Sequence, residues 1–223
     1  MSPDTFEPTE RTRLHRHAER GTYDRELVER TLDEALFCHV GYVVDGGPRV
    51  LPTIHVRVGD TLYIHGSSAS HMLRAIRDGS DVCLVATILD GLVLARSAFS
   101  HSMNYRSVVV YGPAQEVTDP DEKWMAQKAL VDHVCPGRSQ HARTPNETEL
   151  KQTSILALQL REASAKVRTG PPKDDEEDLS LPVWAGVLPL RLVPGEPIDA
   201  PDLAPGILPP PNVTRYQRPP AGP

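Results

Sequence analysis

Short apolar runs separated by glycine-containing turn signals constrain this chain more than any other feature of its sequence. Asp45–Gly46–Gly47, Gly59–Asp60 and Asp90–Gly91 each follow an apolar run, and such turns join neighbouring antiparallel strands. Pro52 lacks the amide that a central strand needs, so its strand is predicted at an edge or a bulge. Strands at this spacing, without a regular alternation with helices, predict an antiparallel barrel or sandwich. The predicted strands span residues 37–44, 49–58, 61–64, 81–89, 92–99, 108–117 and 153–160, the last continuing towards 165–167.

Helices are predicted only as additions to this sheet. The run from Asp24 to Phe37 has apolar residues at helical spacing, with Asp24 as its N-cap. A second helix is expected after residue 70, and a third begins at Asp119–Pro120. Residues 136–149 are polar and are predicted to form a loop. The sequence therefore indicates a mainly β fold that is decorated with α-helices.

Composition excludes several classes of protein. The formal net charge of −6 argues against a nucleic-acid-binding protein, which is usually basic. No stretch approaches the roughly 20 apolar residues that span a bilayer, and the N-terminal sequence has no apolar core that would indicate a secretory signal. The 3 cysteines are scattered, without a CxxC pair, so a structural zinc site is not expected. We therefore expect a cytoplasmic protein that binds neither membrane nor nucleic acid.

The two ends of the chain differ from its centre. Residues 1–20 are polar and predict a loose N-terminal arm, and residues 21–170 hold the predicted strands. Residues 171–193 contain an acidic run and then an apolar segment broken by prolines. This segment predicts an extended arm that docks on the barrel or on a partner chain, with Trp184 as its anchor. Residues 194–223 are so rich in proline that they predict an extended or disordered tail.

A turn rich in serine follows the third predicted strand and precedes a helix. Such turns often hold anions, because the first amides of a helix lack partners and the helix dipole is positive there. The hydroxyls can donate to phosphate oxygens, and a nearby Arg74 can add charge. The plainer interpretation is that one serine only caps the helix. The residues of the turn are His65, Gly66, Ser67, Ser68, Ser70 and His71.

Four segments in this order resemble a known family: CHVGYVVDGGPRVLPTIHV, LYIHGSSASHMLRAI, VCLVATILDGLVLARSAFSHSMNYRSVVVYGPA and TSILALQLREASAKVRTGPP. Over about residues 15–192 the chain is similar to the flavin-binding split barrels related to pyridoxamine 5′-phosphate oxidase, including their nitroimidazole-reductase branch. The resemblance implies a six-stranded antiparallel split β-barrel that forms a homodimer. It also implies FMN as the cofactor, in a groove between the two subunits.

The resemblance also implies which residues bind the cofactor. The turn at 65–71 matches the phosphate-binding turn of the family, but His71 stands where many relatives carry Arg or Lys. Arg74 and Arg106 are the candidates to supply the missing charge. The Arg-x-His pair that holds the substrate of the oxidase has no match here, so vitamin B6 oxidation is not implied. No metal site or catalytic residue is assigned. The implied cofactor-binding residues are Val50, Pro52, Thr53, His65, Gly66, Ser67, Ser68, Ser70, His71, Asn104, Arg106 and Lys166.

Three functions remain open at this point. The first is an FMN-dependent oxidoreductase that acts on an unidentified small organic molecule, with NAD(P)H as a candidate electron donor. The second is a flavin- or haem-binding carrier or sensor without turnover, and the third uses a deazaflavin in place of FMN. Five histidines are candidates for a haem or metal site, although each is more simply a core or groove-lining residue. They are His39, His55, His65, His71 and His101.

Overall fold

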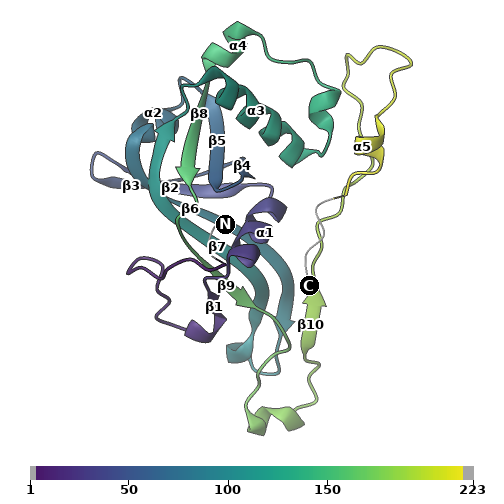
Figure 1. Cartoon of the computed structure of the whole chain (residues 1–223). Coiled ribbons are helices and arrows are strands. Elements are labelled where there is room, and N and C mark those ends of the chain that lie inside the picture. Colours follow the sequence, from purple (N-terminus) through teal and green to yellow (C-terminus); the bar gives the residue numbers. More distant parts are fainter. Residues whose placement is uncertain (1–3, 218–223) are drawn as a thin grey trace.

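The computed structural model describes residues 4–217, and these residues fold around one antiparallel sheet (Figure 1). The main path of the sheet runs β3-β2-β6-β7-β8-β5-β4, and β1, β9 and β10 pair at its sides. The predicted mainly β, antiparallel fold is confirmed. Hydrogen bonds do not join β3 to β4, the two ends of the strand path, so the barrel is open. The strands are β1 (Gly21–Thr22), β2 (Cys38–Val44), β3 (Gly47–Thr53), β4 (His55–Val58), β5 (Thr61–Ser67), β6 (Asp78–Leu94), β7 (Ser102–Glu116), β8 (Thr153–Gln159), β9 (Glu162–Arg168) and β10 (Gly186–Pro189).

The centre of the sheet is a long ribbon made by β6 and β7. The predicted turn at Asp90–Gly91 is wrong, because β6 runs through both residues as one strand of 17 residues. Its register against β7 shifts between Leu89 and Gly91, which marks a β-bulge. Gly91 is also where β10 comes close, since a Cβ there would lie 3.0 Å from the Leu188 oxygen. The same Asp-Gly pair therefore serves a bulge and a close strand contact instead of a hairpin.

The β2–β3 hairpin follows the prediction at its turn. Asp45 and Gly46 have φ angles of 52° and 74°, as a two-residue hairpin loop requires. Pro52 lies in β3 at the end of the sheet path, so the predicted edge position is confirmed. The expected single strand over 49–58 is in fact two strands, because the chain leaves the sheet at Ile54 before it starts β4.

The helices begin at capping residues that the sequence indicated. Asp24 accepts a hydrogen bond from the Leu27 amide at 2.7 Å and starts the first helix. Asp119 does the same for the Glu122 amide at 2.8 Å, directly before a proline at the first turn. The region predicted as a loop, 136–149, contains the start of a further helix that is capped by Asn146. The α-helices are α1 (Arg25–Glu34), α2 (His71–Ile76), α3 (Pro120–Val134), α4 (Glu147–Gln152) and α5 (Pro211–Thr214).

Two hydrophobic clusters form the interior. The larger lies between the curved sheet and helices α1 and α2, with Leu32, Ile76 and Leu84 almost fully buried. The smaller lies where α3 packs on β4, β5 and β8, around Leu130 and Ile155. The N-terminal arm is not loose where the structure describes it, because Phe6 is 3% exposed within the larger cluster. The burial of this one aromatic side chain fixes the arm against the barrel.

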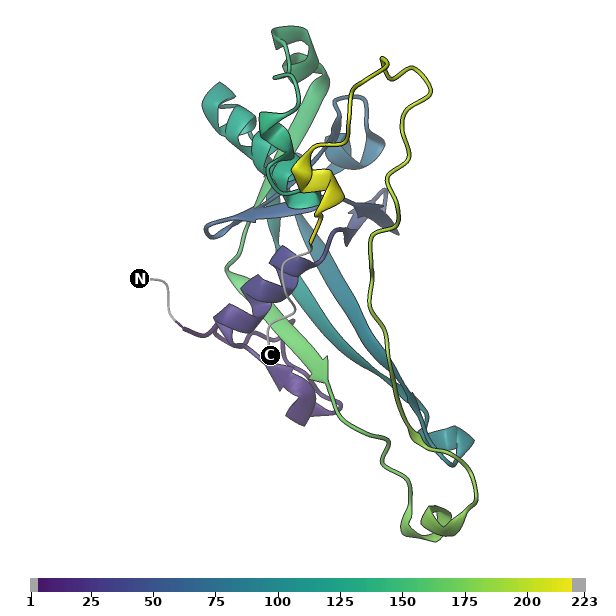
Figure 2. The same ribbon diagram turned by 90° about the vertical axis from the view of Figure 1, so that its right-hand side faces the viewer.

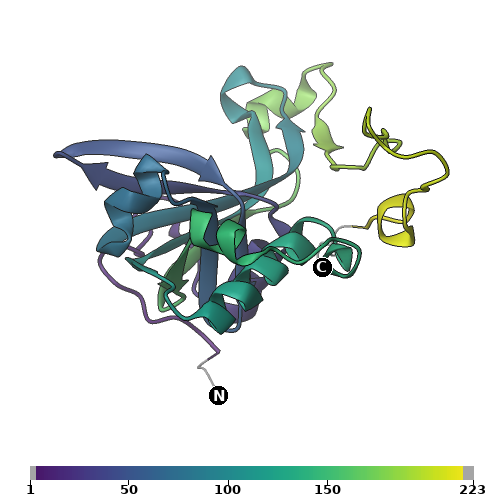
Figure 3. The same ribbon diagram turned by 90° about the horizontal axis from the view of Figure 1, so that it is seen from above.

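The C-terminal segment runs along one side of the barrel and stands away from it (Figures 2 and 3). Asp174 accepts hydrogen bonds from the amide and the guanidinium of Arg96, at 2.8 and 2.9 Å. Strand β10 then pairs with β6, and the main-chain oxygen of Asn212 contacts the Cys135 thiol at 3.6 Å. Between these anchors the segment is exposed, and Trp184 is 67% exposed. Among residues 4–217, no helix is both long and apolar enough to span a membrane.

Candidate functional site

One face of the sheet lies open across five strands. Directly opposed residues of an antiparallel pair lie on the same face, and so do residues two positions apart along a strand. Pro52 opposes His39, His39 opposes Val85, and Val85 opposes Val109, so the face can be followed from β3 to β7. The open face is made of Val50 and Pro52 on β3, His39 on β2, Val85, Thr87 and Leu89 on β6, Tyr105, Ser107 and Val109 on β7, and Lys166 and Arg168 on β9.

The two faces of the sheet differ in burial. Residues that point the other way, such as Val40, Leu84 and Val108, are at most 1% exposed in the larger core. On the open face, Val50 is 63% exposed and Leu89 is 42% exposed. Exposed apolar patches of this kind mark binding or interaction sites. The open face is therefore the part of the barrel best suited to receive a flat ligand or a second chain.

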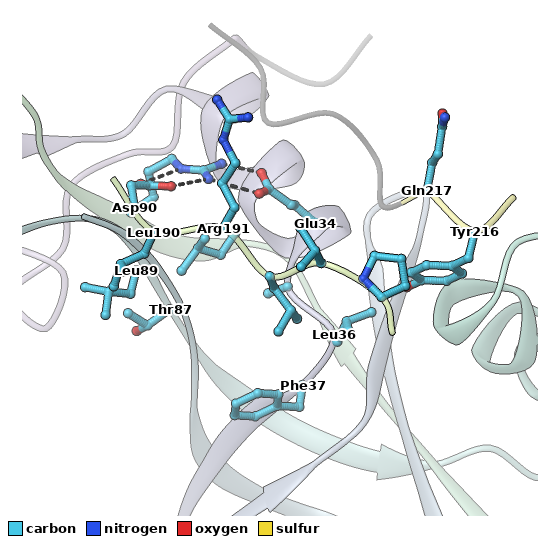
Figure 4. Close-up of a pocket in the computed structure, with 16 residues that line it drawn as sticks. Glu34, Leu36, Phe37, Thr87, Leu89, Asp90, Leu190, Arg191, Tyr216 and Gln217 are labelled. Carbon is cyan, nitrogen blue, oxygen red and sulfur yellow. Dashed lines mark hydrogen bonds and ion pairs between the residues drawn. The ribbon is translucent and has the colours of Figure 1, made fainter. Parts of the chain in front are cut away.

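A cleft of about 720 Å³ lies at the edge of this face (Figure 4). One edge of β6 pairs with β2 over residues 83–85 and with β10 over residues 91–94, and residues 86–89 lie between these two ladders. The end of α1 and the C-terminal segment complete the walls. The lining includes Glu34, Phe37, Thr87, Asp90 and Arg106 from the barrel, and Arg191 and Tyr216 from the C-terminal segment.

Two carboxylates share one guanidinium in the cleft wall, as the dashed lines of Figure 4 mark. Arg106 donates to Asp90 at 2.7 and 3.0 Å and to both oxygens of Glu34. These hydrogen bonds to Asp90 and Glu34 raise the pKa of Arg106. The geometry gives the sequence-predicted Arg106 a place in the cleft, but two carboxylates already neutralise its charge. Its guanidinium is therefore poorly placed to compensate for the missing charge at the serine turn.

The serine turn uses most of its amides internally. The Ser68 amide donates to the Gln152 oxygen at 2.8 Å, and the Ser70 amide donates to the Ser67 oxygen at 2.8 Å. Ser67 Oγ accepts from the Ala69 amide at 3.2 Å. Ser70 is the N-cap of α2, which agrees with the plainer interpretation of the turn. Phosphate binding by this turn stays a prediction, and in this conformation few of its amides are free for it.

The remaining predicted residues fall in different places. Val50, Pro52 and Lys166 share the open face, whereas Thr53 opposes the buried Cys38 on the other face. Asn104 is 8% exposed and donates to the Gly170 oxygen at 3.2 Å. The serine turn is distant from Arg106: Gly66 opposes Ser154, whose hydroxyl donates to Glu116 at the far end of β7. Arg106 precedes Glu116 by ten residues, which is about 30 Å along a strand.

The candidate histidines also differ in accessibility. His55 is fully buried, and its Nε2 lies 2.9 Å from the Leu32 oxygen, so it is a core residue. His39 and His71 are exposed, and His101 Nδ1 lies 2.9 Å from the Ser97 oxygen. His65 is half-buried, and its Nδ1 is buried without a hydrogen-bond partner among the described residues. Burial lowers the pKa of His65, so the neutral form, which can bind a metal, is favoured.

Sequence reasoning missed most residues of the cleft. Glu34 is hidden because helical periodicity treats it as an ordinary polar residue near the end of α1. The sequence predicts Asp90 to be a turn residue, and Tyr216 belongs to a tail for which no docking is predicted. A usable signal was the acidic Asp90 inside an otherwise apolar run, because a charge there needs a partner.

The chain is similar to a protein family and to several solved structures. A family model described as pyridoxamine 5′-phosphate oxidase matches residues 24–167. No sequence among the curated proteins matches the chain. The flavocytochrome Anf3 from Azotobacter vinelandii is 39% identical, with a TM-score of 0.88 over 95% of this chain and 99% of that one. The FAD and heme binding protein from Mycobacterium smegmatis is also 39% identical, with a TM-score of 0.84 over 88% of this chain and 96% of that one.

A third structure shares the fold at lower identity. A putative 5-nitroimidazole antibiotic resistance protein from Bacteroides thetaiotaomicron is 21% identical, with a TM-score of 0.56 over 66% of this chain and 86% of that one. The family model covers more than half of the chain, and the two 39% identical structures are matched over almost their whole length. The chain therefore belongs to the pyridoxamine 5′-phosphate oxidase family.

Proposed function

We propose that this chain is a flavin-dependent oxidoreductase that also binds haem. The observation that carries the proposal is its near full-length similarity to a flavocytochrome and to a protein that binds FAD and haem. The flavin, when bound, supplies the electron-transfer chemistry. FMN was the cofactor expected from the sequence, and the names of the two relatives make FAD the flavin to test beside it. The substrate is a small organic molecule of unassigned identity, and NAD(P)H is the candidate electron donor.

The open face and its cleft fit a flavin. A planar ring needs a flat apolar surface with a few polar groups at its edge, and small-molecule sites commonly combine these features. Val50, Pro52 and Leu89 provide the apolar surface, and the Thr87 hydroxyl lies near Leu89 in the cleft. Arg106 stays charged beside them because Glu34 and Asp90 hold it. These residues would hold and orient the ring, while the C-terminal segment would limit the access of water.

His65 is the best fit for haem. Haem iron in proteins is commonly held by a neutral histidine nitrogen, and the half-buried His65 has a lowered pKa that favours its neutral form. His55 fits less well because it is enclosed in the core. Replacing His65 with Ala should therefore change the haem absorption band or lose the haem, whereas His101→Ala, at an exposed position, should leave the band unchanged.

A homodimer is part of the proposal. The open face leaves apolar side chains in contact with water, and a second copy of the chain would cover them. The exposed Trp184 of the C-terminal segment is the proposed anchor on that second copy. Deleting residues 180–223 should then lower dimer stability and flavin content together, as sedimentation velocity with flavin absorbance would show. A truncated monomer that keeps its full flavin content would contradict a shared site.

The proposal is tested first by its cofactors. The purified full chain should be coloured, and denaturation followed by mass spectrometry should identify FMN, FAD or a deazaflavin, with haem measured in the same sample. Anaerobic mixing with NADH and with NADPH then tests electron transfer. A coloured protein that neither donor nor substrate reduces would favour a carrier or sensor. A colourless protein that binds neither FMN nor FAD would refute the proposal. The three free cysteines fit a cytoplasmic location, which we also propose.

A further inference from the structure

Two basic residues stand at the end of the open face on β9. Lys166 and Arg168 are two positions apart on one strand, so both lie on this face. Lys166 opposes Gly21 of β1, which brings the neighbouring Arg20 to the same end of the sheet. The chain as a whole is acidic, with a net charge of −6. Arg20 forms an ion pair with Glu19 at 3.8 Å, so Lys166 and Arg168 are the two cations of this group that need an explanation.

Arg168 is buried, and no acidic side chain among residues 4–217 pairs with it. It is 7% exposed, and in the described part of the chain its guanidinium donates only to neutral oxygens, those of Asn104, Gly170 and Pro171. Lys166 likewise donates to a neutral oxygen, the main-chain oxygen of Arg16, at 3.3 Å. Burial, and the positive charge of Arg20, lower the pKa of Arg168. Buried charges in proteins are normally paired, so this end of the face lacks an anion.

The other buried or half-buried arginines show the contrast. Arg57 is paired with Asp33, Arg96 with Asp174, and Arg106 with two carboxylates. The chain thus supplies carboxylates where it needs them for its own stability. At Arg168 it supplies only amide and carbonyl oxygens, which accept hydrogen bonds but do not neutralise the positive charge. A bound anion would accept hydrogen bonds and neutralise the charge.

The register connects this group to the cleft. Thr87 opposes Ser107, and Ser107 opposes Lys166, so one row of the open face leads from the cleft to the cations. A second row runs from Leu89 through Tyr105 to Arg168. Each row crosses two strand spacings, which is about 10 Å. The ribityl chain of a flavin separates its ring from its phosphate by a comparable length.

We propose that Lys166 and Arg168, with Arg20 beside them, bind the phosphate or pyrophosphate group of the flavin nucleotide. This inference rests on the proposed function and gives the ligand group an anchor different from the serine turn. The turn uses its amides internally, and Arg106 is neutralised in the cleft. The β9 end of the open face is where unpaired positive charge remains.

Riboflavin, which has no phosphate, makes a sharp test. The flavin-free full chain is titrated with riboflavin, FMN and FAD, and the ratio of the riboflavin Kd to the FMN Kd measures the phosphate contact. Lys166→Gln should lower this ratio about tenfold or more while the riboflavin Kd stays unchanged, because a charge-assisted hydrogen bond is lost. Lys128→Gln, at an exposed lysine of α3, is the matched control and should keep the ratio. Arg168→Gln is tested in the same titrations if its melting temperature shows that the variant folds.

The outcomes separate the two proposals. A wild-type ratio that survives Lys166→Gln and falls with Ser67→Ala/Ser70→Ala would place the phosphate at the serine turn and overturn this inference, while the flavoprotein proposal would stand. Inorganic phosphate that competes with FMN but not with riboflavin would support the anion site, provided that this competition is lost in Lys166→Gln. A chain that binds no flavin would refute the proposed function, and the inference would fall with it unless inorganic pyrophosphate binds in a Lys166-dependent way.

Discussion

His55 makes the stability of this protein depend on pH. The side chain is 0% exposed, and its Nε2 lies 2.9 Å from the Leu32 oxygen near the end of α1. Its Nδ1 is buried without a hydrogen-bond partner in the described part of the chain, and the ring centroid of His133 is 5.3 Å away. A proton on Nδ1 would place a charge in the core. Burial, and secondly the charge of His133, lower the pKa of His55 from 6.5 to about 4.

The sign and size of the effect follow from proton linkage. Above pH 6.5 neither state binds the proton, and the full stability is present. As the pH falls from 6.5 towards 4, the unfolded chain binds a proton that the native chain does not, so the free energy of unfolding falls. The loss is about 2 kcal/mol at pH 5 and approaches about 3 kcal/mol below pH 4.

Urea unfolding followed by circular dichroism at pH 7.5 and pH 5.0 measures this loss. The difference between the two pH values should be about 2 kcal/mol smaller in His55→Gln than in the wild type, because glutamine does not titrate and can still donate to Leu32. Comparing pH differences cancels the cost of the substitution itself. His101→Gln, at an exposed position, should behave like the wild type. Equal pH dependence in His55→Gln and the wild type would refute the reasoning.

Three further predictions concern other contacts. Gly91→Val should detach β10, because a Cβ at this position would lie 3.0 Å from the Leu188 oxygen. Limited proteolysis should then cut the C-terminal segment faster than in the control Gly195→Val, where no atom lies within 4 Å of the added Cβ. Arg106→Gln should lower the free energy of unfolding by about 2 kcal/mol, because Glu34 and Asp90 lose a charged hydrogen-bond partner. An unfolding free energy in urea equal to that of the wild type would contradict this. Ser70→Ala should cost about 1 kcal/mol as a lost N-cap, seen as a lower melting temperature, with the ratio of riboflavin to FMN Kd unchanged; a changed ratio at constant stability would return the phosphate to the serine turn.

Local signals in the sequence identified elements well where the local chain decides the structure. The caps at Asp24 and Asp119 and the turn at Asp45–Gly46 need only neighbouring residues, and all three were correctly predicted. Asp90–Gly91 has the same local chemistry and a different outcome. There, a carboxylate meets Arg106 and a glycine makes room for β10, and both partners are distant in sequence. Turn chemistry alone cannot distinguish a bulge from a hairpin when tertiary contacts decide.

The candidate site was predicted in part for the same reason. Val50, Pro52 and Lys166 share a face because strand alternation fixes their directions once the register is known. The neutralisation of Arg106 was not predictable, because Glu34 lies 72 residues away along the chain. The return of Tyr216 to the cleft depends on contacts of the C-terminal segment that no local pattern encodes.

The β6–β7 ribbon has a consequence for the order of folding. Its innermost pair, Val93 with Ser102, is separated by a short loop, and each further pair outward forms on a ladder that is already closed. The β5–β8 ladder instead pairs Thr61 with Gln159, which requires closure of a much longer loop. Low contact order favours early formation, so the ribbon should zip first and act as the template for β2, β9 and β10. Its central amides should then be the slowest in the protein to exchange with deuterium.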